Sequence, residues 1–218
     1  MSPVTVTVAL LAGIATWIFV VRRLTARSWD SSSEAGDVGA IGTAPQRIGL
    51  WIFLAVVTSL FGLFLSAYSM RSHHGDWSHL TLPDVLWVNT ALLVLGSVSM
   101  QIARNAVSRG LAQRLKLGLI AGGLFTIGFL AGQLIAWGQL RESGQFAQGS
   151  PANAFFYLLT AVHGLHLLGG LWVWGRTMTR LSRGVELVEL RLSVELCTVY
   201  WHYLLLVWFV LFGALTYL

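Results

Sequence analysis

Residues 48–70 read IGLWIFLAVVTSLFGLFLSAYSM, an apolar stretch without a charged side chain. A helix rises about 1.5 Å per residue, so a stretch of this length reaches across the roughly 30 Å hydrocarbon core of a bilayer. In lipid the backbone must satisfy its own hydrogen bonds, which a helix does within one segment. The stretch therefore predicts a transmembrane helix.

The rest of the chain extends this pattern. Hydrophobic residues make up 56% of the sequence and charged residues 11%, and the mean hydropathy of +0.70 argues against a soluble domain. Strands of a membrane barrel are alternating segments of about 10 residues, shorter than these apolar runs. We predict an all-α, polytopic membrane helix bundle with six transmembrane helices. They are expected at residues 4–21, 48–70, 84–103, 117–138, 154–174 and 193–218.

The 14 basic residues indicate orientation rather than nucleic-acid binding, although the net charge is +5. Two of them, Arg71 and Arg141, fall on one side of the predicted bundle, and the others fall in the three loops on the opposite side. Because Lys and Arg accumulate in cytoplasmic loops, we expect both termini on the non-cytoplasmic side. The predicted cytoplasmic residues are Arg22, Arg23, Arg27, Arg47, Arg104, Arg109, Arg114, Lys116, Arg176, Arg180, Arg183 and Arg191.

Composition divides the chain into three parts. Residues 1–27 are predicted to form an N-terminal transmembrane helix, a retained anchor because no basic segment precedes it and Arg22 and Arg23 follow it. Residues 28–46 are rich in Ser, Gly and Ala and predict a flexible cytoplasmic linker. Residues 47–218 hold the other five helices, joined by the short loops of a compact bundle.

Small residues predict close packing along the stretch 117–138. Gly118 and Gly122 form one pair spaced by four, and Gly128 and Gly132 form another. Such pairs let two membrane helices approach closely where hydrophobicity cannot drive their association.

Polar side chains are sparse in the membrane segments and gather on the last two of them. Glu195 is the only acid inside an apolar stretch, and it lies one turn after Arg191, near the predicted cytoplasmic interface. His202 lies close to the expected midplane, with Thr198 between the two. These positions form one stripe along the last helix.

The preceding helix carries a matching stripe of Thr160, His163 and His166. We expect a polar seam in which the histidines tie these two helices together by hydrogen bonds. Membrane histidines also serve as haem ligands or proton carriers, so a haem-binding membrane cytochrome is an alternative, with ligands for at most one haem. A transporter would show repeated halves and broken helices, and neither is evident.

Two further features have ordinary interpretations. The external loop holds His73, His74, Asp76 and His79, which could bind a divalent metal, although such surface residues are more often solvated. The single cysteine, Cys197, excludes an internal disulfide and is interpreted as a small buried apolar residue. We predict no catalytic, cofactor-binding or metal-binding residue in this chain.

Two motifs resemble the cytochrome c oxidase subunit III family. FFYLLTAVHGLHLLGG (155–170) is similar to the family's helix with paired histidines, which fall on His163 and His166. VELCTVYWHYLLLVW (194–208) resembles its last helix, in which a Glu precedes a Tyr-Trp-His motif. The matching residues there are Glu195, Tyr200, Trp201 and His202.

Two more stretches follow the family's order. GLWIFLAVVTSLFGLFLSAY (49–68) and LWVNTALLVLGSVSMQIA (86–103) are similar to two earlier helices, and the second carries Asn89 and Gln101. The resemblance covers about residues 47–218. It implies that the polar motif residues contact lipid or neighbouring subunits.

The resemblance further implies an accessory, metal-free subunit III of a proton-pumping haem-copper terminal oxidase, which reduces O2 to water in a bacterial inner membrane. Haem and copper would belong to partner subunits I and II, with direct contact to subunit I. The chain would hold phospholipids and support the stability and proton uptake of the catalytic subunit in this hetero-oligomer. A homologue attached to a nitric oxide reductase is the alternative at family level.

Two positions depart from the family pattern. Val57 stands where members often carry a buried Glu, and Leu205 stands where many place an Asp after the Trp-His motif. Neither side chain can exchange a proton. A structural and lipid-organising role is therefore favoured over a proton relay.

Overall fold

The computed structural model describes residues 45–72, 77 and 82–217, and every regular element in these ranges is an α-helix. All five helices are long and apolar enough to cross a membrane. The predicted all-α membrane bundle is confirmed, while its first helix and residues 28–44 lie outside the described residues. The helices are α2 (Pro45–Arg71), α3 (Val85–Ser108), α4 (Ala112–Glu142), α5 (Pro151–Ser182) and α6 (Leu187–Tyr217).

The helices extend beyond the apolar stretches that predicted them. α5 continues to Ser182 instead of ending at 174, and α6 begins at Leu187 instead of 193. The additional turns carry charged residues that continue the helix past the hydrocarbon core, which is all that the apolar criterion marks. α2 begins at Pro45, inside the predicted linker 28–46, because proline fits the first turn of a helix.

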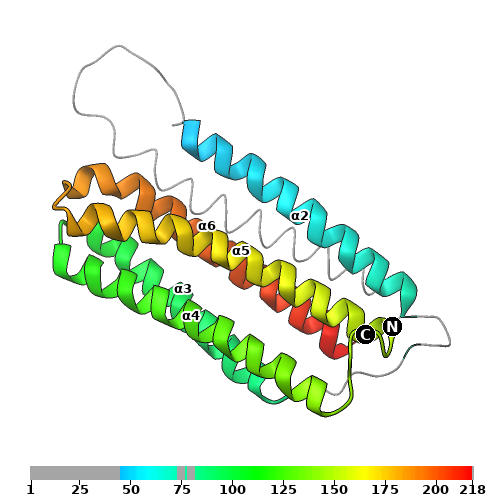
Figure 1. Cartoon of the computed structure of the whole chain (residues 1–218). Helices are drawn as coiled ribbons and strands as arrows, with labels where there is room; N and C mark the ends of the chain where they lie inside the picture. The colour runs from blue at the N-terminus through cyan, green and yellow to red at the C-terminus, as the bar shows by residue number, and fades with distance from the viewer. Residues whose placement is uncertain (1–44, 73–76, 78–81, 218) are drawn as a thin grey trace. The chain divides into compact units, whose positions relative to one another are not determined.

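Consecutive helices run in opposite directions. The start of α2 and the loops joining α3 to α4 and α5 to α6 therefore lie at one end of the bundle (Figure 1). Arg109 and Arg183 lie in these two loops, and Arg47 lies in the first turn of α2. We call this end the basic end.

Glycines bring α3 and α4 close together. A Cβ added to Gly118 would lie 2.9 Å from the Ala103 nitrogen, and one added to Gly122 would lie 2.9 Å from the Met100 sulfur. At Gly132 the oxygen of a neighbouring side chain occupies the place of a Cβ. The predicted packing role of these glycines is confirmed, with Gly128 in ordinary van der Waals contact.

α2 packs differently from the other helices. Only 17% of its apolar stretch is buried, against 56% for α6. The positions that a Cβ would take at Gly49 and Gly62 have nothing within 4 Å. α2 is joined to the other helices through long side chains rather than by close approach of backbones.

Candidate functional site

Four consecutive residues of α6, at 200–203, each hydrogen-bond to a different helix. Tyr200 Oη donates to the carbonyl of His166 on α5 at 2.9 Å. Trp201 Nε1 donates to Thr126 Oγ1 on α4 at 2.9 Å. Successive helical residues are turned by about 100°, so adjacent side chains point in different directions.

The next two residues continue this rotation. His202 Nδ1 and Ser97 Oγ on α3 share a hydrogen bond of 3.0 Å. Tyr203 Oη and Thr58 Oγ1 on α2 share another of 3.0 Å. α6 is thus bonded to each of the other four described helices within about one turn, and we call residues 200–203 the α6 hub.

Tryptophan and threonine side chains form a repeated bridge between helices. In each bridge the threonine hydroxyl donates to the carbonyl four residues earlier in its own helix, at 2.7–2.8 Å. The hydroxyl oxygen is then oriented to accept the indole N–H, which satisfies a polar group that burial would otherwise leave unpaired. The bridges are Trp201–Thr126, Trp208–Thr90 and Trp137–Thr160, at 2.9, 2.9 and 3.1 Å.

Glu195 joins three helices near the basic end. Its Oε2 accepts from Arg47 Nη2 on α2 at 2.9 Å, and its Oε1 accepts from Arg104 Nη2 on α3 at 3.2 Å. The Glu195 side chain is 16% exposed, against 36% for Arg47 and 20% for Arg104. Both carboxylate oxygens therefore have a cationic partner, and we call the three residues the Glu195 cluster.

His163 lies among aromatic rings. It is fully buried, and neither ring nitrogen has a hydrogen-bond partner in the described part of the chain. Its ring centroid lies 6.4 Å from that of Phe61 on α2, 5.7 Å from Phe129 on α4 and 5.4 Å from Trp208 on α6. The side chain fills space where four helices meet.

The expected histidine seam between the last two helices is wrong for the described residues. His166 Nδ1 bonds to the Val162 carbonyl of its own helix at 2.7 Å, and His202 bonds to α3. Thr160 accepts from α4 instead of α6. The reason is rotation, because the stripe at 195, 198 and 202 faces α3, whereas Tyr200 faces α5.

The remaining motif residues occupy two different environments. Asn89 on α3 is buried and donates from Nδ2 to Gln133 Oε1 on α4 at 3.3 Å. Its Oδ1 has no hydrogen-bond partner among the described residues and lies where a Cβ of Gly132 would be. Gln101 instead bonds to Asn105 of its own helix at 3.2 Å, on the surface.

Several partners in these contacts were missed by sequence reasoning. Ser97, Thr126 and Thr58 are short hydroxyl residues that also bond within their own helices in many proteins, so their types alone gave no signal. A usable signal was the number of tryptophans inside apolar stretches, because each buried indole needs an acceptor. Arg47 and Arg104 were interpreted only as markers of orientation, although both pair with Glu195.

Candidate metal or haem ligands do not gather in the described residues. In those ranges there is no group of three or more His, Cys, Asp or Glu side chains that could hold a metal ion. His163 and His166 both lie near the ring of Phe61, at 6.4 and 5.4 Å between ring centroids, whereas His202 bonds to Ser97 on α3. The loop residues His73, His74, Asp76 and His79 lie outside the described residues.

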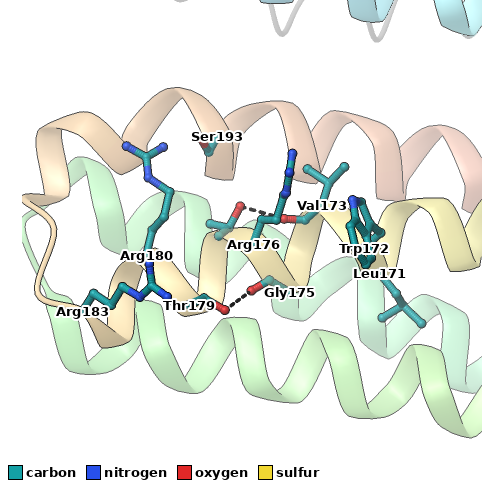
Figure 2. A pocket seen from close by; sticks show the side chains of 10 residues that line it. Leu171, Trp172, Val173, Gly175, Arg176, Thr179, Arg180, Arg183 and Ser193 are labelled. Carbon is teal, nitrogen blue, oxygen red and sulfur yellow. Dashed lines mark hydrogen bonds between the residues drawn. The ribbon is translucent and has the colours of Figure 1, made fainter.

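A groove of about 690 Å³ lies between α5 and α6 towards the basic end. Figure 2 shows Arg176 and Arg180 on α5 and Arg183 just after its end, with Ser193 across from them on α6. The guanidinium of Arg176 lies 5.8 Å from the centre of the Trp172 ring, a cation–π arrangement. The groove thus combines positive charge with an apolar wall.

Comparison with known proteins agrees with this architecture. A sequence model of the family described as cytochrome c oxidase subunit III matches residues 47–218, all of the described helices but the first two residues of α2. A cytochrome c oxidase subunit 3 from Corynebacterium diphtheriae is 28% identical over 192 residues, covering 78% of this chain and 91% of the relative. A quinol oxidase subunit 3 from Bacillus subtilis is 25% identical over 173 residues, covering 76% and 83%. A probable quinol oxidase subunit 3 from Staphylococcus saprophyticus is 27% identical, covering 87% and 93%. The chain belongs to the cytochrome c oxidase subunit III family and is a subunit of a terminal oxidase complex.

Proposed function

We propose that this chain is a metal-free, non-catalytic subunit of a bacterial proton-pumping oxidase that reduces O2 to water. The observation that carries the proposal is the α6 hub, in which the motif residues Tyr200, Trp201 and His202 are engaged in joining helices. Side chains used in this way are not directed at a substrate. The reaction would therefore take place on other subunits.

The division of labour in the complex follows from this proposal. Haem and copper belong to subunits I and II, and this chain contacts subunit I directly through membrane helices. Val57 is buried in α2 and Leu205 is half-buried in α6, at the two positions where an acid would support proton transfer. The subunit then contributes stability and organisation of lipid around the catalytic subunit more than it contributes a proton path.

The orientation and the division of the chain form part of the same proposal. The basic end lies in the cytoplasm of a bacterial cell with an inner membrane, and both termini lie on the opposite side. Residues 1–27 cross the membrane once, residues 28–46 link them to the core, and residues 47–218 form the five-helix core. The support is the distribution of Lys and Arg among the loops.

The groove between α5 and α6 is proposed to hold phospholipid. Arg176 and Arg183 suit a phosphate group, while Arg180 pairs with Glu189 at 3.4 Å, and Leu171, Trp172 and Val173 suit an acyl chain. Arg176→Gln with Arg183→Gln should lower the amount of phospholipid that native mass spectrometry finds with the purified complex. The control is Arg191→Gln, at the same end of the bundle but outside the groove lining. Equal lipid content in both variants would contradict this site.

Purification of the complex tests the assignment of the subunit. An affinity-tagged chain extracted gently from its native membrane should bring with it subunits that show haem bands in a reduced-minus-oxidised spectrum and that mass spectrometry identifies as an oxidase. After the complex is dissociated, the isolated chain should show no haem band. A haem band that stays with the isolated chain would overturn the proposal.

A variant of the hub refines this experiment. His202→Ala removes the hydrogen bond to Ser97 and should weaken retention of the subunit in the complex. The haem bands of the remaining catalytic subunits should keep their positions and intensity. If a haem band disappears from the His202→Ala complex, His202 would instead be a haem ligand.

A further inference from the structure

The first turns of α2 are poorly packed. None of residues 46–53 is buried, and Ile48, Ile52 and Phe53 are 48%, 62% and 46% exposed. Burial begins at Leu54, which is fully buried, and continues with Val57 and Phe61. Residues 46–53, which we call the α2 arm, thus precede the first buried residue of the helix.

The α2 arm also lacks the close approach that locks the other helices. The space where a Cβ of Gly49 would lie has nothing within 4 Å, whereas one at Gly118 would lie 2.9 Å from the backbone of Ala103. A helix without interlocked backbones can tilt without first breaking a tight contact. Side-chain contacts therefore hold the arm. At its start they include the ion pair of Arg47 with Glu195, and at its end, next to Leu54, the ring of Phe53 lies 6.3 Å from that of His166 and 6.1 Å from that of Tyr200.

The Glu195 cluster holds the arm in an unusual way. Arg47 on the arm binds Oε2 of Glu195, while Arg104 on α3 binds Oε1. Breaking a simple partly buried ion pair leaves a charge without compensation, which makes separation costly. Here Arg104 stays with the carboxylate when Arg47 leaves, and Arg47, at 36% exposure, is already partly open to its surroundings.

We propose that the α2 arm is a releasable element held by the Arg47–Glu195 ion pair, its clamp. Arg104 lowers the free energy needed for release, because it stays paired with Glu195. The segment from Leu54 to Phe61 is the pivot, because Leu54, Val57 and Phe61 are its buried contacts and because Thr58 bonds to Tyr203 of the hub. The arm is about 12 Å long, so a tilt of roughly 20° moves its end by about 4 Å. That displacement is enough to break the hydrogen bond to Glu195.

Spin-label distance measurement on the purified complex tests this proposal. Labels on Ile48→Cys in the arm and Val188→Cys at the start of α6 occupy exposed positions, and Cys197→Ala removes the native thiol. When the Glu195 cluster is unchanged, the labelled complex should show two label-to-label distances that differ by about 4 Å. Glu195→Gln should raise the population at the longer distance, relative to that at the shorter distance, about fivefold, because the clamp loses its charge.

The decisive variant is Arg104→Gln, for which release and simple stabilisation predict opposite results. If Arg104 compensates Glu195 after release, its loss should lower the proportion of the long distance, because release would leave the carboxylate alone. If the cluster is only a structural support, Arg104→Gln and Glu195→Gln should both raise that proportion. The second result, or a single distance in every variant, would overturn the proposal.

Two controls keep this comparison interpretable. Glu189→Gln breaks the exposed ion pair with Arg180 at the same end of the bundle, 3.4 Å in length, and should leave the distances unchanged. The haem spectrum of each complex reports whether the catalytic partners are intact, so loss of the complex is distinguished from a change in the arm. If Arg104→Gln does not assemble, Arg104→Lys keeps the charge and should restore the two distances.

Discussion

At the scale of single residues, this subunit uses polar side chains to connect helices. Trp201 and Thr126 are 1% and 0% exposed, so both polar groups depend on each other inside the membrane. Interhelical hydrogen bonds in membrane proteins contribute about 0.6 kcal/mol on average and up to roughly 1.7 kcal/mol. The hub therefore stabilises the subunit through the sum of several modest bonds.

Thr126→Val should lower the free energy of unfolding by about 1 kcal/mol, because Trp201 Nε1 then loses its acceptor. Thermal unfolding of the purified complex measures the change. The matched control is Thr216→Val, an exposed threonine on α6 that bonds to the carbonyl of Phe212, and it should change the midpoint little. Equal effects of the two substitutions would contradict the importance of the bridge.

His163→Phe should leave the stability of the subunit within about 1 kcal/mol of the original, because the imidazole nitrogens form no hydrogen bond with the described residues. His202→Phe should cost more, since it leaves Ser97 without its partner. Thermal unfolding compares the two variants. If His163→Phe instead stopped O2 reduction in an intact complex, the residue would have a chemical role that its aromatic surroundings do not suggest.

At the scale of helices, α3 and α4 depend on glycine. The Asn89 side chain fits against Gly132 because no Cβ stands between them, and the same amide binds Gln133. The contact joins a polar pair that is buried at 1% and 4% exposure. Substitution of the glycine would disturb both the packing and the hydrogen bond.

Gly132→Ala should destabilise the subunit by roughly 1–3 kcal/mol, because a Cβ would overlap the Asn89 oxygen. Gly138→Ala on the same helix is the matched control, since its Cβ would have nothing within 4 Å. Unfolding midpoints of the two variants in the purified complex provide the comparison. A destabilisation by Gly138→Ala as large as that by Gly132→Ala would refute the role of close approach.

The helices themselves were predictable because apolar length is a local property of the sequence. Glycine spacing in 117–138 likewise predicted a packing face, and the close approaches at Gly118 and Gly122 confirm it. Helix ends were less predictable, because the charged turns of α5 and α6 beyond the hydrocarbon core are not apolar. The periodicity of polar residues identified the stripe at 195 and 202 but not the helix that it faces.

At the scale of the whole molecule, the position of α6 explains what the sequence alone could not provide. Facing partners depend on how five helices are arranged, and neither Ser97 nor Thr58 carries that information in its residue type. Once α6 is surrounded, a run of four residues reaches four neighbours through helical rotation alone. The family resemblance identified this motif in the sequence, and its contacts came from the structure.

We propose that this chain supports an oxidase without taking part in its chemistry. The most direct measurement is O2 consumption over time by the purified complex with and without this subunit, normalised to haem content. We expect equal initial rates and equal haem spectra, with earlier loss of activity during turnover when the subunit is absent. An initial rate that falls in proportion to the missing subunit, or an unchanged lifetime in its absence, would contradict the claim.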